Sequence, residues 1–120
     1  MNDQWAFARP YLEAALEYSG GTHTIDDVRA AIDRRDMLLI TGRNCAMVYE
    51  VLSYPQMKIL HGFLCGGDLE ELKSFDPYLQ EMAKTLGCAK VTIAGRQGWV
   101  RALRGLGYAH SCTVISKEVT

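Results

Sequence analysis

The sequence predicts one α/β domain, residues 1–120, with about four helices on a mixed and mostly antiparallel sheet. Three observations predict this class. Three short apolar runs are separated only by turn residues, which is typical of an antiparallel meander. A long amphipathic stretch then precedes a fourth apolar run, which indicates a parallel crossover. Finally, the chain is 48% hydrophobic and 22% charged, as ordinary globular domains are.

Two helices are expected before the first strand. Residues 3–19 place apolar side chains at helical spacing, and Pro10 either kinks this helix or starts its regular part. A Ser-Gly-Gly sequence ends it in the usual way. Thr24, with an acidic residue three positions later, is close to a capping box and predicts a second helix over about 25–35.

Three strands are expected next, at residues 37–41, 45–53 and 57–65. The segments between them, 42–44 and 54–56, contain glycine, asparagine and proline, which favour tight turns. Connections this short join antiparallel strands, so the three strands form the meander.

The second half of the chain alternates helix and strand. Pro77 lies inside the first of these helices, which predicts a kink there, or a restart capped by Ser74 or Asp76. Because a helix separates them, strands 57–65 and 90–94 are expected to pair in parallel. The expected elements are a helix at 68–86, a strand at 90–94, a helix at 97–106 and a last strand at 108–116.

The charge balance excludes some partners. A formal net charge of −1 creates no field that draws nucleic acid or an anionic membrane, and neither is expected as a partner. Arg96, Arg101 and Arg104 are more simply the solvated side of a helix than a patch for nucleic acid. No apolar run approaches the ~18 residues that span a bilayer, and the N-terminus lacks a signal-peptide layout. A cytoplasmic protein is expected.

The four cysteines give no metal site. Cys45, Cys65, Cys88 and Cys112 lie 20 or more residues apart, so no pair has the spacing of zinc ligands. Three of them fall in or beside apolar strand-like runs, where a free cysteine behaves as a small hydrophobe. We expect buried, reduced thiols.

The stretch from Met57 to Leu72 organises the chain. It predicts a strand, a turn at Gly66-Gly67, and a helix that opens on Asp68. Such a turn exposes backbone N–H groups at the positive end of a helix dipole, where α/β proteins commonly hold anions. However, Asp68, Glu70 and Glu71 fill the first turn of this helix, and their charges repel a phosphate.

The element order, together with Gly95 to Trp99 and Gly107-Tyr108, resembles the GNAT acyltransferase fold. More closely, the chain resembles small GNAT-like proteins of phages and prophages, which are mostly of unknown function. The resemblance covers nearly the whole chain through an ordered set of short motifs. These are Gly20-Gly21-Thr22, Tyr54-Pro55, Gly66-Gly67, Gly87-Cys88 and Gly95-Arg96-Gln97-Gly98-Trp99.

The resemblance implies a splayed pair of parallel strands, with acyl-CoA in the gap between them and its pyrophosphate on the turn after the first strand. Acetyl-CoA is then the one expected cofactor. By this resemblance the candidate cofactor-binding residues are Leu64, Cys65, Gly66 and Gly67. Arg96 is a further candidate, because it follows the last parallel strand at the mouth of the same gap; it either contacts a phosphate from the opposite side or satisfies carboxylates such as Glu70 or carbonyls at a strand end. The chain departs from the family at this turn, which lacks the basic residue and the spaced glycines. It departs again at Leu103, which stands where the family has a catalytic tyrosine.

Two residues are candidates for proton transfer. Glu50 lies mid-strand in a sheet that helices cover, where a raised pKa suits a general base; the alternative is a rim position facing water. His61 is expected to lie near Glu50 on the neighbouring strand, either as a base or simply as a hydrogen-bonded histidine. A nucleophilic role for Cys65 has less support, because no base is adjacent in the spacing.

Two functions therefore remain open. In the first, the chain is a diverged or catalytically impaired phage-type GNAT-like protein that acts through protein contacts, in virion assembly or host interaction. In the second, it is an active N-acetyltransferase that transfers an acetyl group from acetyl-CoA to an amine. The oligomeric state is open, although an exposed last strand offers an edge for a second chain.

Overall fold

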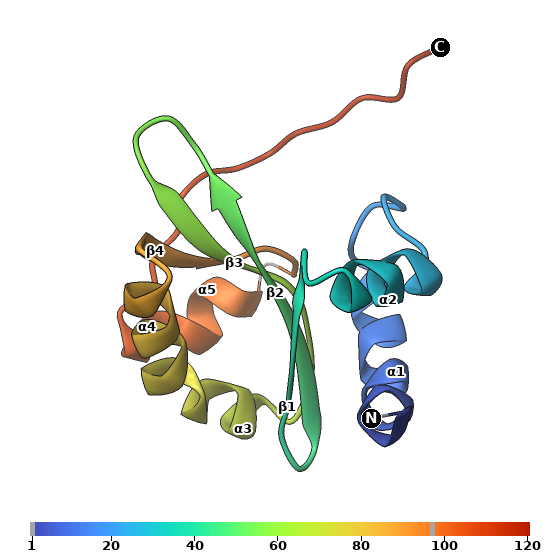
Figure 1. Cartoon of the computed structure of the whole chain (residues 1–120). Coiled ribbons are helices and arrows are strands. Elements are labelled where there is room, and N and C mark those ends of the chain that lie inside the picture. Colours follow the sequence, from blue (N-terminus) through green and yellow to red (C-terminus); the bar gives the residue numbers. More distant parts are fainter. Residues whose placement is uncertain (1, 97) are drawn as a thin grey trace.

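A computed structural model describes residues 2–96 and 98–120, and shows a four-stranded sheet with helices on both faces (Figure 1). Gln97, where the sequence starts the fourth helix, lies outside these residues. The elements are α1 (Asn2–Leu16), α2 (Ile25–Asp33), β1 (Leu38–Thr41), β2 (Cys45–Ser53), β3 (Lys58–Gly67), α3 (Leu69–Ser74), α4 (Asp76–Thr85), β4 (Cys88–Ile93), α5 (Gly98–Leu103) and the 3-10 helix η1 (Arg104–Leu106).

The sheet confirms the predicted fold class. Its strands lie in the order β1-β2-β3-β4; the first two pairs are antiparallel and the β3–β4 pair is parallel. The meander follows from the short turns, and the parallel pair from the helices between β3 and β4. The described residues form five α-helices where about four were expected, because the predicted helix 68–86 is divided in two.

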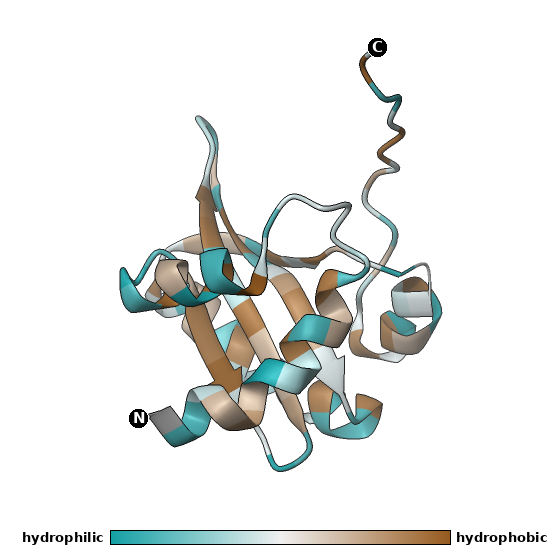
Figure 2. Cartoon of the chain, turned by 90° about the vertical axis from the view of Figure 1, so that its right-hand side faces the viewer, coloured by the Kyte–Doolittle hydropathy of each residue, from teal (hydrophilic) through white to brown (hydrophobic). Residues whose placement is uncertain are grey.

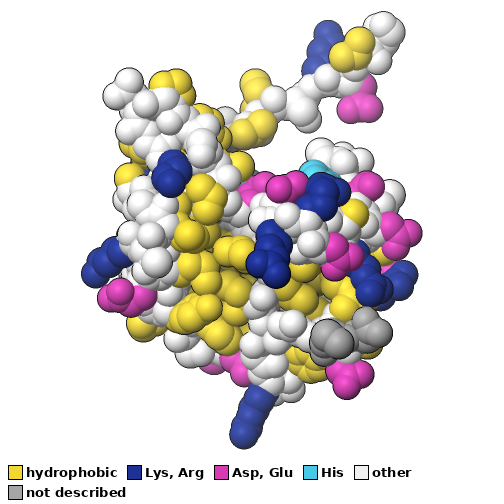
Figure 3. Space-filling view, viewed as in Figure 1, with side chains coloured by type: hydrophobic (Ala, Val, Ile, Leu, Met, Phe, Trp, Pro, Cys, Tyr) yellow, Lys and Arg dark blue, Asp and Glu magenta, His cyan; other side chains and the backbone are white. Residues whose placement is uncertain are grey.

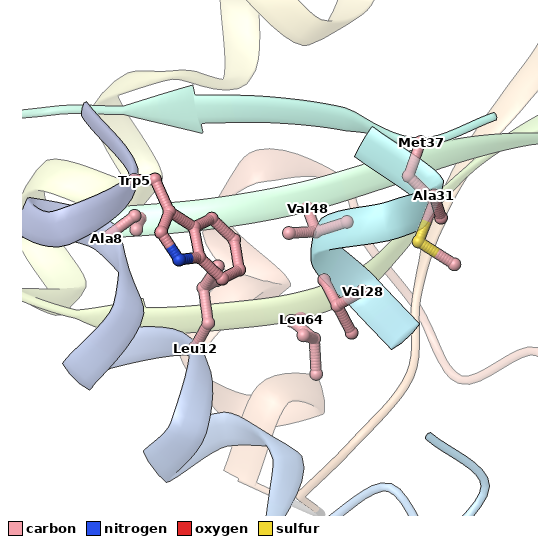
Figure 4. Packing of buried hydrophobic residues seen from close by; sticks show 9 residues of the cluster. Trp5, Ala8, Leu12, Val28, Ala31, Met37, Val48 and Leu64 are labelled. Carbon is pink, nitrogen blue, oxygen red and sulfur yellow. The ribbon is translucent and has the colours of Figure 1, made fainter. Parts of the chain in front are cut away.

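The helices α1 and α2 cover one face of the sheet. Trp5, Ala8 and Leu12 of α1 meet Val28 of α2 over the buried Val48 of β2 (Figure 4). The helix α1 runs through Pro10 without ending there. The capping box at the start of α2 is confirmed: the Asp27 N–H donates to the Thr24 hydroxyl over 3.1 Å, and the Thr24 N–H donates to the Asp27 carboxylate over 2.8 Å.

The opposite face packs against α3, α4 and α5. Its core joins Met47, Tyr49 and Leu60 of the sheet to Leu72 and Leu79 of the helices. Coloured by hydropathy, the strands are largely hydrophobic while the helices turn hydrophilic residues outward (Figure 2). This two-sided burial explains why the strands read as continuous apolar runs.

The break between α3 and α4 confirms that Pro77 interrupts the predicted helix. Phe75 ends α3 and begins α4, so neither Ser74 nor Asp76 serves as the N-cap. Pro77 occupies the first turn of α4, where its missing N–H leaves no hydrogen bond unmade.

The prediction of a turn at Gly66-Gly67 is wrong. Both glycines belong to β3, where Gly66 pairs with Ala46 and Gly67 with Cys45. β3 continues through both glycines because the neighbouring strand β2 begins at Cys45 and supplies a pairing partner for each of them. The connection to α3 is therefore Asp68 alone.

The prediction of a last strand at 108–116 is also wrong. No strand forms there, and residues 109–120 are all exposed on a segment that leaves the body of the molecule (Figure 1). Strand propensity gives no structure without a partner edge. Cys112 is consequently exposed and Cys88 only half-buried, whereas Cys45 and Cys65 are buried as expected; all four are free thiols. Within the described residues, no helix is long and apolar enough to cross a membrane.

Candidate functional site

The parallel strands β3 and β4 separate at their carboxyl ends. They pair as far as Gly62 and Ile93, and a last hydrogen bond runs from the Ala94 N–H to the Gly62 carbonyl over 3.3 Å. Beyond that point β3 continues to Gly67 beside β2 only. From Phe63 onward, the edge of β3 that faced β4 is open, and this confirms the predicted splayed pair.

A cavity of about 280 Å³ lies in this gap. It is close to the lower end of the volumes of small-molecule sites, about 300–1,000 Å³. Its wall combines the end of α1 and the α1–α2 connection with β3, the residues after β4, and α5. The lining residues are Ala15, Tyr18, Ser19, Thr22, His61, Phe63, Leu64, Cys65, Ala94, Gly95, Arg96 and Trp99.

His61 is the titratable imidazole of this wall. Its Nδ1 lies 2.7 Å from the Thr92 hydroxyl oxygen on β4. Burial lowers the pKa of His61, although the charge of Glu50 acts in the opposite direction. The ring is therefore neutral near pH 7. When Nδ1 donates its hydrogen to Thr92, the Nε2 lone pair is left to accept a proton.

Glu50 lies beside His61, on the neighbouring strand β2. The two residues are register partners in the β2–β3 pair, as the sequence predicts. Glu50 is half-buried. The structure brings both candidate bases together, and only His61 lines the cavity.

Arg96 provides positive charge at the cavity. Its guanidinium carbon lies 5.0 Å from the centre of the Tyr18 ring and 5.8 Å from that of Trp99, so the two aromatic rings hold the cation. None of the ion pairs among residues 2–96 and 98–120 includes Arg96. Trp99 packs against the core under α3–α5 and forms a wall of the cavity, rather than filling it.

The two glycines have a structural explanation. A Cβ on Gly66 would lie 2.5 Å from the Tyr11 carbonyl oxygen, because α1 passes directly over this part of β3. Gly67 has a φ of +113°, and a Cβ there would collide with the Asn44 carbonyl oxygen. Neither residue lines the cavity, in contrast to the other candidates Leu64, Cys65 and Arg96.

The N-terminus of α3 is already occupied by carboxylates of the chain. The Asp68 side chain accepts from the Glu70 N–H over 2.9 Å and from the Glu71 N–H over 3.3 Å. The Glu71 carboxylate accepts from the Asn44 and Arg43 N–H groups over 2.7 Å and 2.8 Å. The hydrogen bond from Asn44 is the largest cause that lowers the pKa of Glu71. Charge and occupied donors both disfavour a phosphate here.

Cys65 and Leu103 are poor candidates for chemistry. Burial raises the pKa of Cys65 to about 12, so the cavity holds a thiol and not a nucleophilic thiolate. Leu103 is buried on α5, and its side chain has no ionisable group that could donate a proton. Sequence reasoning missed Tyr18, Phe63 and Thr92. A signal existed only for Thr92, since pairing 57–65 with 90–94 places it on the strand beside His61.

Comparison with known proteins identifies the fold. No family profile matches the chain, and no curated protein sequence matches it. Solved structures do match. A possible acetyltransferase from Clostridium difficile has a TM-score of 0.61 at 14% identity, covering 99% of this chain and 92% of its own. A GNAT family acetyltransferase from Staphylococcus aureus has a TM-score of 0.56 at 13% identity, covering 98% and 88%.

Glucosamine-6-phosphate N-acetyltransferase from Arabidopsis thaliana is also similar, with a TM-score of 0.56 at 14% identity over 90% of both chains. At such identities the likeness shows the fold. This chain has the fold of the GNAT acetyltransferases, as the sequence motifs predict.

Proposed function

We propose that the protein is an N-acyltransferase that uses acetyl-CoA to acylate an amine. The observation that carries the proposal is the gap between β3 and β4, with a cavity of about 280 Å³ and His61 in its wall. The GNAT fold of the chain supports it, because its structural neighbours include acetyltransferases.

The donor would be held by the wall of the gap. The open edge of β3 after Gly62 offers backbone N–H and C=O groups to an extended amide-bearing chain, as a neighbouring strand would. Among the described residues that line the cavity, Arg96 is the one that carries a permanent positive charge, so it would contact the phosphate groups of the donor. The N-terminus of α3 does not fit a pyrophosphate, since Asp68 occupies its donors.

His61 would act as the base. An amine attacks only in its unprotonated form, and a neutral imidazole within the cavity can accept the proton that the attacking nitrogen loses. The thioester supplies the activated acyl group. The leaving group is an alkyl thiol, and thiols ionise readily, as the pKa of about 8.5 of a cysteine side chain shows. The thiolate can therefore leave without a strong acid, and a leucine at position 103 is compatible with turnover.

Calorimetric titration with acetyl-CoA tests the binding half of the proposal. We expect a Kd of about 100 μM or tighter, weakened at least tenfold by Arg96→Ala, since a charge-assisted contact is lost. Arg104→Ala is the matched control, because Arg104 lies exposed on η1 away from the cavity and should bind normally. Absence of binding at millimolar donor would refute the proposal.

Release of free thiol from acetyl-CoA, measured with a panel of primary amines, tests the catalytic half. His61→Gln keeps a hydrogen-bonding group of similar size but no base, so kcat should fall about 10²–10⁴-fold while Kd for the donor changes little. His110→Gln, on the exposed C-terminal segment, should retain full activity. An unchanged kcat in His61→Gln would show that another group removes the proton.

A second candidate is a diverged phage-type protein that acts through protein contacts, in virion assembly or host interaction. The specific observations in its favour are the occupied N-terminus of α3 and the buried Leu103. Under this alternative the purified chain binds neither acetyl-CoA nor CoA, and a fold built for a cofactor has become a binding scaffold.

A further inference from the structure

The wall of the cavity carries no carboxylate. Among the described residues that line it none is Asp or Glu, and much of the wall is apolar, with Ala15, Phe63, Leu64, Cys65, Ala94 and Trp99. Carboxylates are plentiful elsewhere on the molecule, and Figure 3 shows Asp and Glu side chains spread over one outer face. A molecule that enters the cavity therefore meets a wall that is neutral or positive.

The polar side chains of the wall already have hydrogen-bond partners. The Ser19 hydroxyl donates to the Leu16 carbonyl over 2.8 Å, and the Thr22 hydroxyl oxygen lies 2.7 Å from Nδ1 of His23. His61 keeps its Nε2 for the amine that reacts. A second ammonium group on the acceptor would thus find no opposite charge in the wall, and an ammonium that leaves water without a partner is costly.

The aromatic rings of the wall do not form a free cage for a cation. Aromatic faces attract cations, but each of these three rings already contacts another group. The guanidinium carbon of Arg96 lies 5.0 Å from the centre of the Tyr18 ring and 5.8 Å from that of Trp99. The centre of the His23 ring lies 4.7 Å from that of Phe63. The rings therefore offer a new ligand apolar contact more than attraction for charge.

The negative charge near the wall is directed elsewhere. Glu50 does not line the cavity, and its charge acts on His61, where it favours the imidazolium that forms when the base takes a proton. The phosphates of the donor would contact Arg96. The pantetheine arm separates those phosphates from the thioester, beside which the acceptor must lie.

We infer that the acceptor is a primary amine on an uncharged apolar or aromatic body, and that amines with a second ammonium group are poor substrates. The inference rests on the proposed acyl transfer and names the class of its acceptor. The reacting nitrogen enters unprotonated, so such an amine brings no unpaired ion into the cavity. Its lone pair forms the new C–N bond, its proton passes to Nε2 of His61, and the C–S bond breaks to release the thiolate.

Two amines built on the same ring test the inference. Para-methylbenzylamine has one ammonium group in water, and para-xylylenediamine has two. Thiol release from acetyl-CoA gives kcat/KM for each, and we expect the monoamine to be favoured at least about tenfold, because the second ammonium must leave water without a partner. Calorimetric titration of both amines into the protein with CoA present measures the same preference in binding, without turnover.

Thr22→Glu tests the physical cause. It places a carboxylate in the wall, at an exposed position between α1 and α2, and gives the second ammonium a partner. The preference for the monoamine should fall at least about tenfold. Thr22→Gln is the matched control: it has the same length and loses the same contact with His23 but adds no charge, so it should keep the wild-type preference. Far-UV circular dichroism compares the folding of both variants with wild type.

The outcomes separate this inference from the proposed function. If neither amine is acetylated, acyl transfer to amines is refuted, whereas tighter binding of the monoamine would still support the selectivity of the wall. The inference is overturned if the wild-type protein uses or binds the diamine as well as the monoamine, or if it binds neither. It is also overturned if Thr22→Glu and Thr22→Gln show the same preference, because charge is then not the cause.

Discussion

Substituting Gly67 by alanine tests whether the glycine pair at the end of β3 serves packing or a phosphate. The backbone at Gly67 has a φ of +113°, a conformation that alanine rarely adopts. A Cβ there would also lie 2.6 Å from the Cys45 Cα, a backbone atom that cannot rotate away. Both costs come from the folded state, with no ligand involved.

The expected magnitude follows from these two costs. A left-handed backbone costs a residue with a side chain about 1–2 kcal/mol, and overpacking in a tight site about 1–3 kcal/mol. Gly67→Ala should therefore lower the free energy of unfolding by about 2–5 kcal/mol, out of a total of the order of 5–15 kcal/mol for a domain.

Urea unfolding followed by circular dichroism measures the loss, and two other glycines separate its causes. Gly20 has a φ of +78° with nothing within 4 Å of a Cβ, so Gly20→Ala carries the backbone cost alone, about 1 kcal/mol. Gly98 opens α5 with open space around it, and Gly98→Ala should be neutral or stabilise by up to about 1 kcal/mol.

The order of the three variants is the decisive result. If Gly67→Ala costs no more than Gly20→Ala, the close approach of the β1–β2 turn does not explain the glycine. A stable Gly67→Ala protein that has lost affinity for acetyl-CoA would instead show that the turn holds the cofactor.

Three further predictions concern the core and two titratable groups. Leu12→Ala, at a side chain with no exposed surface, should cost about 2–5 kcal/mol in urea unfolding, whereas Val119→Ala on the exposed segment should stay within about 0.5 kcal/mol; equal effects would contradict the described core. Glu71→Gln should lower the urea midpoint near neutral pH, because the pKa of the folded carboxylate is lowered. The difference from wild type should vanish as the pH falls below 4.5. A difference that stays constant with pH would show that the negative charge of Glu71 is not its cause. The pKa of His61 in the folded chain is below its ordinary value of 6.5, so the unfolded chain binds the proton more readily. The free energy of unfolding should therefore fall as the pH drops through that value, and His61→Gln should flatten this part of the profile. A slope that persists in His61→Gln would show that another group causes the pH dependence.

Much of the fold could be predicted from the sequence, because its determinants are local. The boundaries of β2 (Cys45–Ser53) match the prediction, since turn residues flank an apolar run on both sides. The capping box at Thr24 depends on two residues three positions apart. Glu50 and His61 are cross-strand partners, and this pairing follows from the length of the turn between their strands.

The candidate site was less predictable, because it is assembled from distant segments. Tyr18 lies beside Arg96 only because the α1–α2 connection crosses the end of the sheet, and no spacing in the sequence relates the two. The roles of the predicted cofactor residues stay a prediction, although Leu64, Cys65 and Arg96 share the wall of one cavity.

The sequence by itself determined where most of the helices and strands lie, since hydrophobic period and turn chemistry act over a few residues. Only the tertiary structure decided how far β3 extends and whether residues 108–116 form a strand. The physical reason is the same in both cases. A strand exists where a neighbouring edge accepts its hydrogen bonds: β2 supplies that edge to Gly66 and Gly67, and no part of the described chain supplies it to the C-terminal segment.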